Sequence, residues 1–252
     1  MERTHERVEM TDEVVRGYQA EFVTVGIIGH LIDRGFMDPG IRPLIPGAKV
    51  VGRAVTVSMP SVDTTANRRA VEAAEPGDVI IVDCGGDDRV SRWGELICFD
   101  AMYKGVAGLV IDGAISASGP IRAMGFPVFC RSITGLVGRR LNRDGAVGIP
   151  VQCGGVTVHP GDLIVADDDG AVVIPAAEAA PLLEQCRQRF GGGQKDSAKR
   201  WIVSGRPYAA FPGLGWEERT DLPAPARTPA SERADAAAWL ARAGLEKSAG
   251  DR

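Results

Sequence analysis

The fold is decided by the stretch PGDVIIVDCGGDDRVSRWGELICFDAMYKGVAGLVIDGA (residues 76–114). Its first part, 76–86, contains a turn, a continuous apolar strand and a glycine pair, and its last part, 105–114, is a second apolar strand that ends in Asp-Gly. Between them, 95–104 carries apolar residues at helical spacing. Fully apolar strands that alternate with helices predict a parallel or mixed sheet covered by helices, and therefore the α/β class.

The same alternation extends on both sides of this stretch. The expected elements are a helix over about 10–35, a loop over 35–47, strands over 49–60 and 126–131, and short helices over 67–74 and 120–124. The segment 150–175 is β-rich and contains glycine turns, which predicts a β-meander, and a helix follows over 176–189. We therefore expect one α/β domain over 1–195.

The composition changes after residue 195, and we expect 196–252 to form a C-terminal extension. Its expected parts are an aromatic loop over 205–218 (Tyr208, Phe211 and Trp216), a Pro/Ala linker over 221–233 and a short helix over 234–243. A segment rich in Pro and Ala cannot fold alone. We therefore expect the extension to lie on its own domain, where it could cover the site, or on a neighbouring subunit.

Charge and composition exclude several classes of protein. The 252 residues carry a formal charge of −4, which argues against nucleic acid and anionic membranes as partners. No apolar run approaches the ~20 residues of a membrane-spanning helix, and the charged first residues predict no secretory leader. The five cysteines form no C-x-x-C pair, which predicts buried free thiols and a cytoplasmic protein.

Two strand ends are the natural places for a site, because ligands of such sheets bind beyond the carboxyl ends of the strands. These ends are 83–86 and 112–114, and the segment 93–97 lies between them at a predicted helix start. Unpaired backbone N–H groups and the helix dipole there favour an anion such as a carboxylate or a phosphate. No dinucleotide-binding or Walker-type phosphate motif is present.

Two further features allow competing interpretations. The triple aspartate 167–169, followed by Gly170, could bind a hard metal ion. However, neighbouring side chains of a strand point to opposite faces, which favours a solvated hairpin turn. His30 is expected on a helix, either as a packed or surface residue or as an acid/base.

Several stretches are shared with one known family. They are MDPGIRPLIPGAKVVGRAVTV (37–57), PGDVIIVD (76–83), WGELI (93–97), KGVAGLVIDGA (104–114), RAMGFPVF (122–129) and VQCGGVTVHPGDLIVADDDGAVVIP (151–175). On these residues the chain resembles the 4-hydroxy-4-methyl-2-oxoglutarate aldolase/oxaloacetate decarboxylase family, which also includes the RraA-type inhibitors of ribonuclease E. The resemblance implies a β/β/α layered fold, similar to the swivelling phosphohistidine-domain type, assembled as a homotrimer or hexamer with sites between subunits.

The resemblance also implies a chemistry. Enzymes of this family are metal-dependent lyases that cleave or decarboxylate 2-oxo acids through a pyruvate enolate. By this resemblance, the backbone amides of 94–97 hold the carboxylate of the substrate. In the family motif D-G-x-x-R-D, the Arg binds substrate and the final Asp ligates magnesium or manganese, which acts as a Lewis acid on the enolate oxygen.

This sequence departs from the family at that motif. Asp112-Gly113-Ala114-Ile115 is followed by Ser116-Ala117 in place of Arg-Asp, and the segment 27–31 also loses a polar pair. Because alanine has no ligand atom and serine is neutral, we expect no bound magnesium or manganese and no other cofactor. The candidate catalytic residues are His30, Glu95, Asp112 and Ser116, and the candidate substrate-binding residues are Gly94, Glu95, Leu96, Ile97, Gly113, Ser116 and Ala117.

Three functions remain open. The first is a divergent lyase-type enzyme with a rebuilt, metal-independent site for a carboxylate- or oxo-bearing small molecule, as in secondary metabolism. Arg122 could replace the lost cation there, although it also matches the ordinary family pattern. The second is a non-catalytic binding or regulatory protein on the same fold. The third is a metal-dependent aldolase or decarboxylase whose ligand is relocated to Asp63, Asp83, Asp87 or Asp88.

Overall fold

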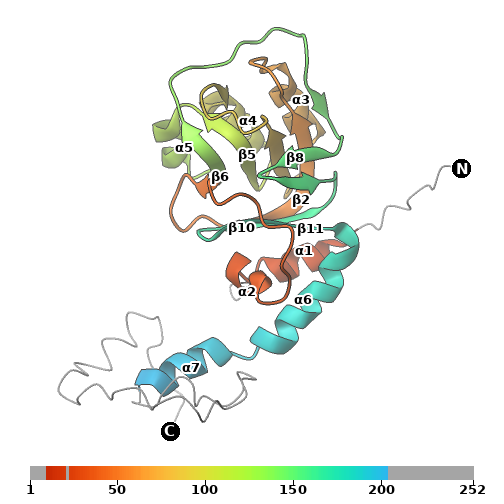
Figure 1. Cartoon of the computed structure of the whole chain (residues 1–252), viewed down its shortest axis with the longest axis vertical. Coiled ribbons are helices and arrows are strands. Elements are labelled where there is room, and N and C mark those ends of the chain that lie inside the picture. Colours follow the sequence, from red (N-terminus) through yellow and green to blue (C-terminus); the bar gives the residue numbers. More distant parts are fainter. Residues whose placement is uncertain (1–9, 21–22, 204–252) are drawn as a thin grey trace, which may run out of the picture. The chain divides into compact units, whose positions relative to one another are not determined.

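A mixed sheet forms the centre of the computed structural model, which describes residues 10–20 and 23–203 (Figure 1). The strands are β1 (Arg42–Pro43), β2 (Val50–Ser58), β3 (Val79–Asp83), β4 (Ser91–Trp93), β5 (Gly108–Ile115), β6 (Val128–Ile133), β7 (Ala146–Val147), β8 (Val151–Cys153), β9 (Val156–Val158), β10 (Leu163–Asp167) and β11 (Gly170–Ile174). The helices are α1 (Asp12–Tyr18), α2 (Val25–Gly29), α3 (Thr65–Ala73), α4 (Glu95–Tyr103), α5 (Ser118–Met124), α6 (Ala176–Phe190) and α7 (Gln194–Val203).

The order of the strands explains the alternation seen in the sequence. The path runs β1-β6-β5-β3-β2-β10-β11, and β2, β3, β5 and β6 are parallel to one another. The antiparallel pair β10 and β11 continues the sheet from β2, while β8 and β9 pair separately. The predicted mixed sheet is therefore confirmed. The meander expected over 150–175 is wrong as one unit, because β8–β9 and β10–β11 are two separate hairpins and β9 does not pair with β10.

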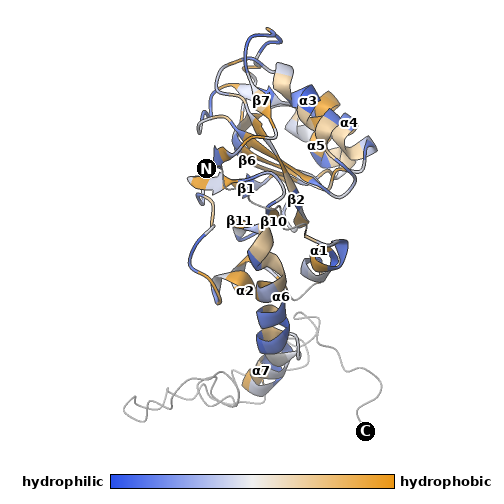
Figure 2. Cartoon of the chain, turned by 90° about the vertical axis from the view of Figure 1, so that its right-hand side faces the viewer, coloured by the Kyte–Doolittle hydropathy of each residue, from blue (hydrophilic) through white to orange (hydrophobic). Residues whose placement is uncertain are grey.

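The sheet is apolar on both faces, as its continuous apolar strands require. Ile80 and Leu109 belong to a buried cluster on the face covered by α3, α4 and α5. Because side chains alternate along a strand, Ile81 and Val110 point the other way, into a second cluster with residues of β8 to β11. Figure 2 shows these hydrophobic strands between the helices and the β10/β11 layer. The result is the expected β/β/α layering.

The N-terminal helix expected over about 10–35 is wrong as one element. The structure has two short helices, α1 and α2, separated by residues that include Thr24. The Thr24 side chain accepts a hydrogen bond from the backbone N–H of Ile27 at 3.2 Å and so caps α2. A side chain that caps a helix start favours extended backbone at its own position, which interrupts the helical pattern.

The triple aspartate lies in the β10–β11 hairpin, as the turn interpretation predicted. Two of its three carboxylates also accept hydrogen bonds from the backbone N–H groups of other segments. Asp167 accepts from Val25 at the start of α2 at 2.8 Å, and Asp168 accepts from Gly47 at 2.8 and 3.1 Å. The hairpin therefore binds two segments that are far from it in the sequence, the start of α2 and the loop at Gly47.

The predicted domain boundary at residue 195 lies close to a division of the chain into two units, 1–186 and 187–252, which passes through α6. The aromatic loop, the linker and the last predicted helix lie outside the described residues. All five cysteines are free and buried, as predicted. Within residues 10–20 and 23–203, no helix has the length and apolar character needed to span a bilayer.

Candidate functional site

The two predicted strand ends lie side by side. Asp83 at the end of β3 is in register with Asp112 on β5, and β4 runs parallel to the last residues of β5. The chain leaves β4 at Trp93 and enters α4 directly after Gly94. The start of α4 therefore lies at the carboxyl edge of the parallel sheet, where the sequence predicts an anion site.

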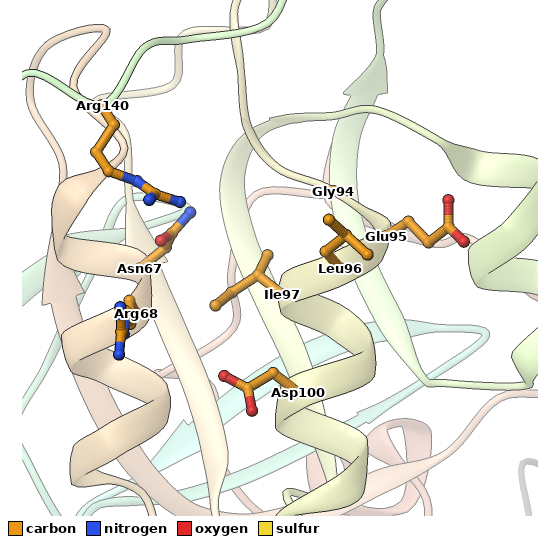
Figure 3. Close-up of a pocket in the computed structure, with 8 residues that line it drawn as sticks. All are labelled: Asn67, Arg68, Gly94, Glu95, Leu96, Ile97, Asp100 and Arg140. Carbon is orange, nitrogen blue, oxygen red and sulfur yellow. The ribbon is translucent and has the colours of Figure 1, made fainter.

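A pocket of about 510 Å³ opens at this helix start (Figure 3). It is lined by Asn67, Arg68, Gly94, Glu95, Leu96, Ile97, Asp100 and Arg140. All four residues of the predicted carboxylate-binding segment are among them. No side chain caps α4, since its N-cap residue is Gly94. The first backbone N–H groups of the helix are therefore free to bind an anion.

The wall opposite α4 is cationic. Asn67 and Arg68 come from α3, and Arg140 comes from the loop that follows β6. Figure 3 shows the Arg140 guanidinium beside the Asn67 amide, across the pocket from Ile97. The Asn67 amide donates to the backbone carbonyl of Arg92 at 3.3 Å, and Arg68 pairs with Glu72 at 3.0 Å. In the described part of the chain, the Arg140 guanidinium has no hydrogen-bond or ion-pair partner.

A buried carboxylate organises the loop that carries Arg140. Asp63 is 1% exposed and accepts the backbone N–H groups of Leu141 at 3.0 Å, Arg143 at 2.7 Å and Asp144 at 3.3 Å. It also accepts from the amide and hydroxyl of Thr65. Burial alone would raise the pKa of Asp63, but these hydrogen bonds outweigh it and hold the pKa well below its usual range.

The other side of the α4 start is less polar. The Ser116 N–H donates to the carbonyl of Trp93 at 3.0 Å, and a Cβ added at Gly94 would lie 3.1 Å from the Ser116 hydroxyl oxygen. Ala117 is exposed and has a left-handed backbone, with φ 56° and ψ 40°, at the start of α5. Glu95 points away from Asn67, Arg68 and Arg140.

Asp112 and Gly113 serve packing rather than the pocket. The buried Asp112 carboxylate accepts the Nε–H of Arg131 and the backbone N–H of Gly154 at 2.8 Å. A Cβ at Gly113 would lie 2.8 Å from the Cβ of Cys84, so the glycine allows a close approach of two strand ends. The predicted roles of Asp112 in catalysis and of Gly113 in binding find no support in these contacts and stay predictions.

His30 is not brought to the pocket within one chain. It is the exposed C-cap residue of α2, and α2 contacts β10 and β11. Figure 1 shows α2 on the opposite side of the β10/β11 layer from α4. Arg122, the other cation considered, donates to the carbonyl of Leu44 at 3.2 Å and to the Ser118 hydroxyl at 3.3 Å. These bonds give Arg122 a structural role.

The residues present do not fit the metal ion that the resemblance implies. Ala117 offers no ligand atom, and the Asp112 carboxylate already binds Arg131 and Gly154. In the described ranges, no three His, Cys, Asp or Glu side chains converge. The pocket at the strand ends has two carboxylates in its lining, Glu95 and Asp100, and within the described residues they form no set of metal ligands with a third such side chain.

Two of the other aspartates considered as relocated ligands, Asp83 and Asp87, accept backbone N–H groups as Asp63 does. Asp83 accepts the backbone N–H groups of Gly85 at 2.8 Å and Gln152 at 3.2 Å. The Arg89 backbone N–H and the Arg92 side chain bind Asp87 at 2.9 Å each, and they hold the pKa of Asp87 below its usual value. The backbone carbonyl of the remaining one, Asp88, accepts the Ser132 hydroxyl.

Sequence reasoning missed the cationic wall. Asp63 and Leu141 are 78 residues apart, so nothing local indicates that the loop around Arg140 folds back onto the start of α3. Arg131, the partner of Asp112, was also missed, because a lone arginine at a strand end has no distinctive pattern. The only available signal was the pair Asn67-Arg68 at the start of a predicted helix.

Residues 25–173 match the family described as RraA-like, Aldolase/RraA. A protein of Halalkalibacterium halodurans named "Putative 4-hydroxy-4-methyl-2-oxoglutarate aldolase" is 39% identical over 149 residues, which cover 59% of this chain and 70% of that protein. A 4-hydroxy-4-methyl-2-oxoglutarate aldolase of Thermus thermophilus is 30% identical over 128 residues, or 51% of this chain and 77% of that protein.

Solved structures show the same fold. Streptomyces coelicolor RraAS2, described as an unusual member of the RNase ES inhibitor RraA protein family, matches with a TM-score of 0.62 and 30% identity over 75% of this chain and 96% of that one. An uncharacterized protein from Pseudomonas syringae pv. tomato matches with a TM-score of 0.67 and 24% identity over 79% and 96%. The second likeness concerns the fold alone.

Proposed function

Because this chain belongs to the RraA-like family (Aldolase/RraA), we propose that it is a divergent, lyase-type enzyme that acts on a small acid bearing a carboxylate and an oxo group. One observation carries the proposal. The uncapped start of α4 opens into a pocket whose opposite wall carries Asn67, Arg68 and Arg140. Such a site is concave, anion-binding and large enough for a small molecule.

The chemistry would proceed through charge stabilisation by protein groups. The substrate carboxylate binds the backbone N–H groups of Leu96 and Ile97. The bond that breaks joins the carbon next to the oxo carbon to the following carbon. Its electron pair moves into an enolate, and the other fragment leaves as carbon dioxide or, after its hydroxyl loses a proton, as a carbonyl compound. The enolate oxygen is stabilised by fixed donors at the same helix start. We assign to Glu95 and the Ser116 hydroxyl the transfer of the proton that the resulting carbanion takes up.

The proposed enzyme uses no metal ion and no other cofactor. Ser116 and Ala117 stand where the family resemblance places a substrate-binding arginine and a metal-binding aspartate, and the nearby carboxylates of Asp63, Asp83 and Asp87 bind backbone amides. A metal-dependent enzyme with a relocated ligand is therefore the less favoured alternative. The buried free thiols support a reducing, cytoplasmic compartment.

A non-catalytic regulatory role is the second candidate. It is favoured by the likeness to Streptomyces coelicolor RraAS2, which belongs to an inhibitor family and is covered over 96% of its length. Both candidates predict ligand or partner binding on this fold. Only the enzyme predicts turnover that depends on groups around the α4 pocket, so steady-state kinetics separate the two.

We further propose that the protein forms a homotrimer or hexamer. Leu96, Phe99 and Tyr103 are 83%, 55% and 86% exposed on the outer face of α4, and such a stripe of large apolar side chains on a helix fits a protein interface. Light scattering at micromolar concentration tests this, with Phe99→Glu expected to dissociate the assembly and exposed Glu72→Lys on α3 as the control. A monomeric unmodified protein contradicts the proposal.

The experiment that tests the function combines structures with kinetics. Crystals soaked with pyruvate or oxalate, with and without magnesium, should show the acid bound at Leu96 and Ile97 in both conditions. A panel of 2-oxo acids should then yield at least one substrate, whose turnover is insensitive to EDTA and falls in Glu95→Gln. Turnover that EDTA abolishes supports a relocated metal ligand, and acid binding without any turnover supports the regulatory role.

A further inference from the structure

We propose that Arg92 is a positioning residue of the α4 pocket, because its buried guanidinium fixes the amides at the start of α4 relative to the opposite, cationic wall. The inference rests on the proposed function, since it takes the amides of Leu96 and Ile97 as the groups that bind the substrate carboxylate. The lining of the pocket does not include Arg92, so this side chain would act on a ligand through the backbone that it holds.

Arg92 lies at a β-bulge directly before the start of α4. Ser91 pairs with Ala114 of β5, and Trp93 pairs with the next residue of β5, Ile115. Between these two pairs β4 therefore has one residue more than β5, and that residue is Arg92. A bulge re-aims a side chain and is common beside active sites. Arg92 is only 3% exposed, so its side chain is directed into the protein.

Every nitrogen of the Arg92 guanidinium donates a hydrogen bond. Nε donates to the carbonyl of Ser61, one Nη donates to the carbonyl of Val90 at 3.2 Å, and the other binds the Asp87 carboxylate at 2.9 Å. Ser61 comes from the loop between β2 and α3, and Asp87 from the loop between β3 and β4. An apolar side chain would fill this buried place at a lower desolvation cost. Stability alone therefore does not call for an arginine here.

These contacts join the two walls of the pocket. On the α4 side, Arg92 is two residues before Gly94, the N-cap residue of the helix. On the opposite side, the Arg92 carbonyl accepts the Asn67 amide at 3.3 Å, and the Ser61 hydroxyl accepts the backbone N–H of Asp63 at 3.1 Å. Asp63 is the buried carboxylate that organises the cationic loop. A displacement of Arg92 would therefore move the helix start relative to the cationic wall.

The position of these amides matters for binding. Amides that are already ordered in the folded protein bind an anion more tightly than mobile ones, because no ordering is needed when the ligand arrives. β4 has three residues, so few backbone pairings restrain it, and the side chain of Arg92 adds a restraint beside α4. In Arg92→Met the carbonyl of Ser61 loses this donor, and we expect the helix start to become more mobile and to bind an acid more weakly.

The test is a calorimetric titration of the full-length protein and its variants with pyruvate, at a temperature where urea denaturation shows each variant to be folded. We expect pyruvate to bind about tenfold more weakly to Arg92→Met and about threefold more weakly to Arg92→Lys, since an ammonium keeps only part of the contacts. A residue that merely stabilises the fold would not change the affinity of a fully folded variant.

Two control variants separate positioning from other effects. Val173→Ala removes buried apolar atoms on β11, so it should lower the urea midpoint and leave the affinity for pyruvate within about twofold. Asp87→Asn removes the ion pair but leaves the guanidinium on the carbonyls of Ser61 and Val90. Because the Asp87 side chain is 31% exposed and lines neither wall, this variant should also stay within about twofold. Should Arg92→Met fail to fold, the contrast between Arg92→Lys and Asp87→Asn gives the same answer.

The outcomes separate this role from the proposed function. Unchanged affinity for pyruvate in folded Arg92→Met, or in Arg92→Lys, overturns the positioning role while acid binding at the α4 start stands. An equal loss in Asp87→Asn also overturns it, because the charge of the pair and not the contact with Ser61 would then matter. An equal loss in Val173→Ala overturns it as well, because affinity would then follow stability. Failure of the unmodified protein to bind pyruvate overturns both the positioning role and the proposed acid site.

Discussion

The two sides of the α4 start differ in charge and in how they are held. On one side, Ser116 and Ala117 form a neutral corner, and the Ser116 N–H donates to the carbonyl of Trp93 just before the helix start. On the other side, Arg140 is held by a loop wrapped around the buried Asp63. An anion at this helix start would therefore find its cation on the α3 side. Under the proposed function, the amides of 94–97 bind the carboxylate of the substrate, and the cation nearest to that role lies on the wall opposite the Ser116–Ala117 corner.

The largest effect is expected from substitutions that restore charged side chains on the neutral side of the α4 start. In Ser116→Arg with Ala117→Asp, we expect magnesium binding by calorimetry and about a hundredfold gain in oxaloacetate decarboxylation, because a cation and a metal ligand return beside the amides of 94–97. Ser116→Arg alone is the control, since it lacks the ligand. Robust, EDTA-sensitive decarboxylation by the unmodified protein would instead show that the metal ligand lies elsewhere.

Asp112 lies near the end of β5, the strand that leads to the Ser116–Ala117 corner. Removing its ion-pair partner should destabilise the fold that carries both sides of the α4 start. Arg131→Ala leaves the buried Asp112 without its guanidinium partner, and we expect the free energy of unfolding to fall by about 3 kcal/mol. Urea denaturation at pH 7 measures this. Arg34→Ala, which removes the exposed pair with Glu178, is the control and should cost no more than about 0.5 kcal/mol. A similar small loss in Arg131→Ala would mean that Asp112 is held by Gly154 alone.

Lowering the pH should reduce the free energy of unfolding through protonation of Asp63, the carboxylate that holds the loop of Arg140. Its pKa is held below the usual value of about 4 in the folded protein. The stabilisation from its ionised form is therefore complete above about pH 4, the unfolded pKa, and is lost as the pH falls through the lower, folded pKa. The stability difference between the unmodified protein and Asp63→Asn should stay constant from pH 7 to 5 and shrink below about pH 4. A difference that grows in acid would contradict the sign of this effect.

The sequence predicted one side of this site far better than the other. The parallel strands and the α4 start could be predicted because each depends on local patterns, such as the apolar run 79–82 and the segment 93–97. The sequence offered Asp63 only as a possible metal ligand and did not point to Arg140, because their structural relation depends on backbone contacts that span 78 residues or more. The contacts of Asp112 could not be predicted for the same reason, since its partner Arg131 comes from the next strand and Gly154 from a separate hairpin.

The smallest expected effect concerns the left-handed backbone of Ala117, on the neutral side of the α4 start. Ala117 has φ 56°, a left-handed conformation that costs a residue with a Cβ about 1 kcal/mol, whereas glycine adopts it freely. Ala117→Gly should therefore raise the free energy of unfolding by about 0.5 kcal/mol, the remainder being offset by the greater freedom of glycine in the unfolded chain.

The matched control for this change lies further along the same helix. Ala123 is exposed within α5, and Ala123→Gly should lower the free energy of unfolding by about 1 kcal/mol, since glycine disfavours a helix interior. The two substitutions make the same chemical change and should move the urea midpoint in opposite directions. A loss of stability in both would show that Ala117 is not strained, and that the Ser116–Ala117 corner adopts a relaxed conformation instead of retaining a turn suited to an aspartate, a residue that tolerates positive φ better than alanine.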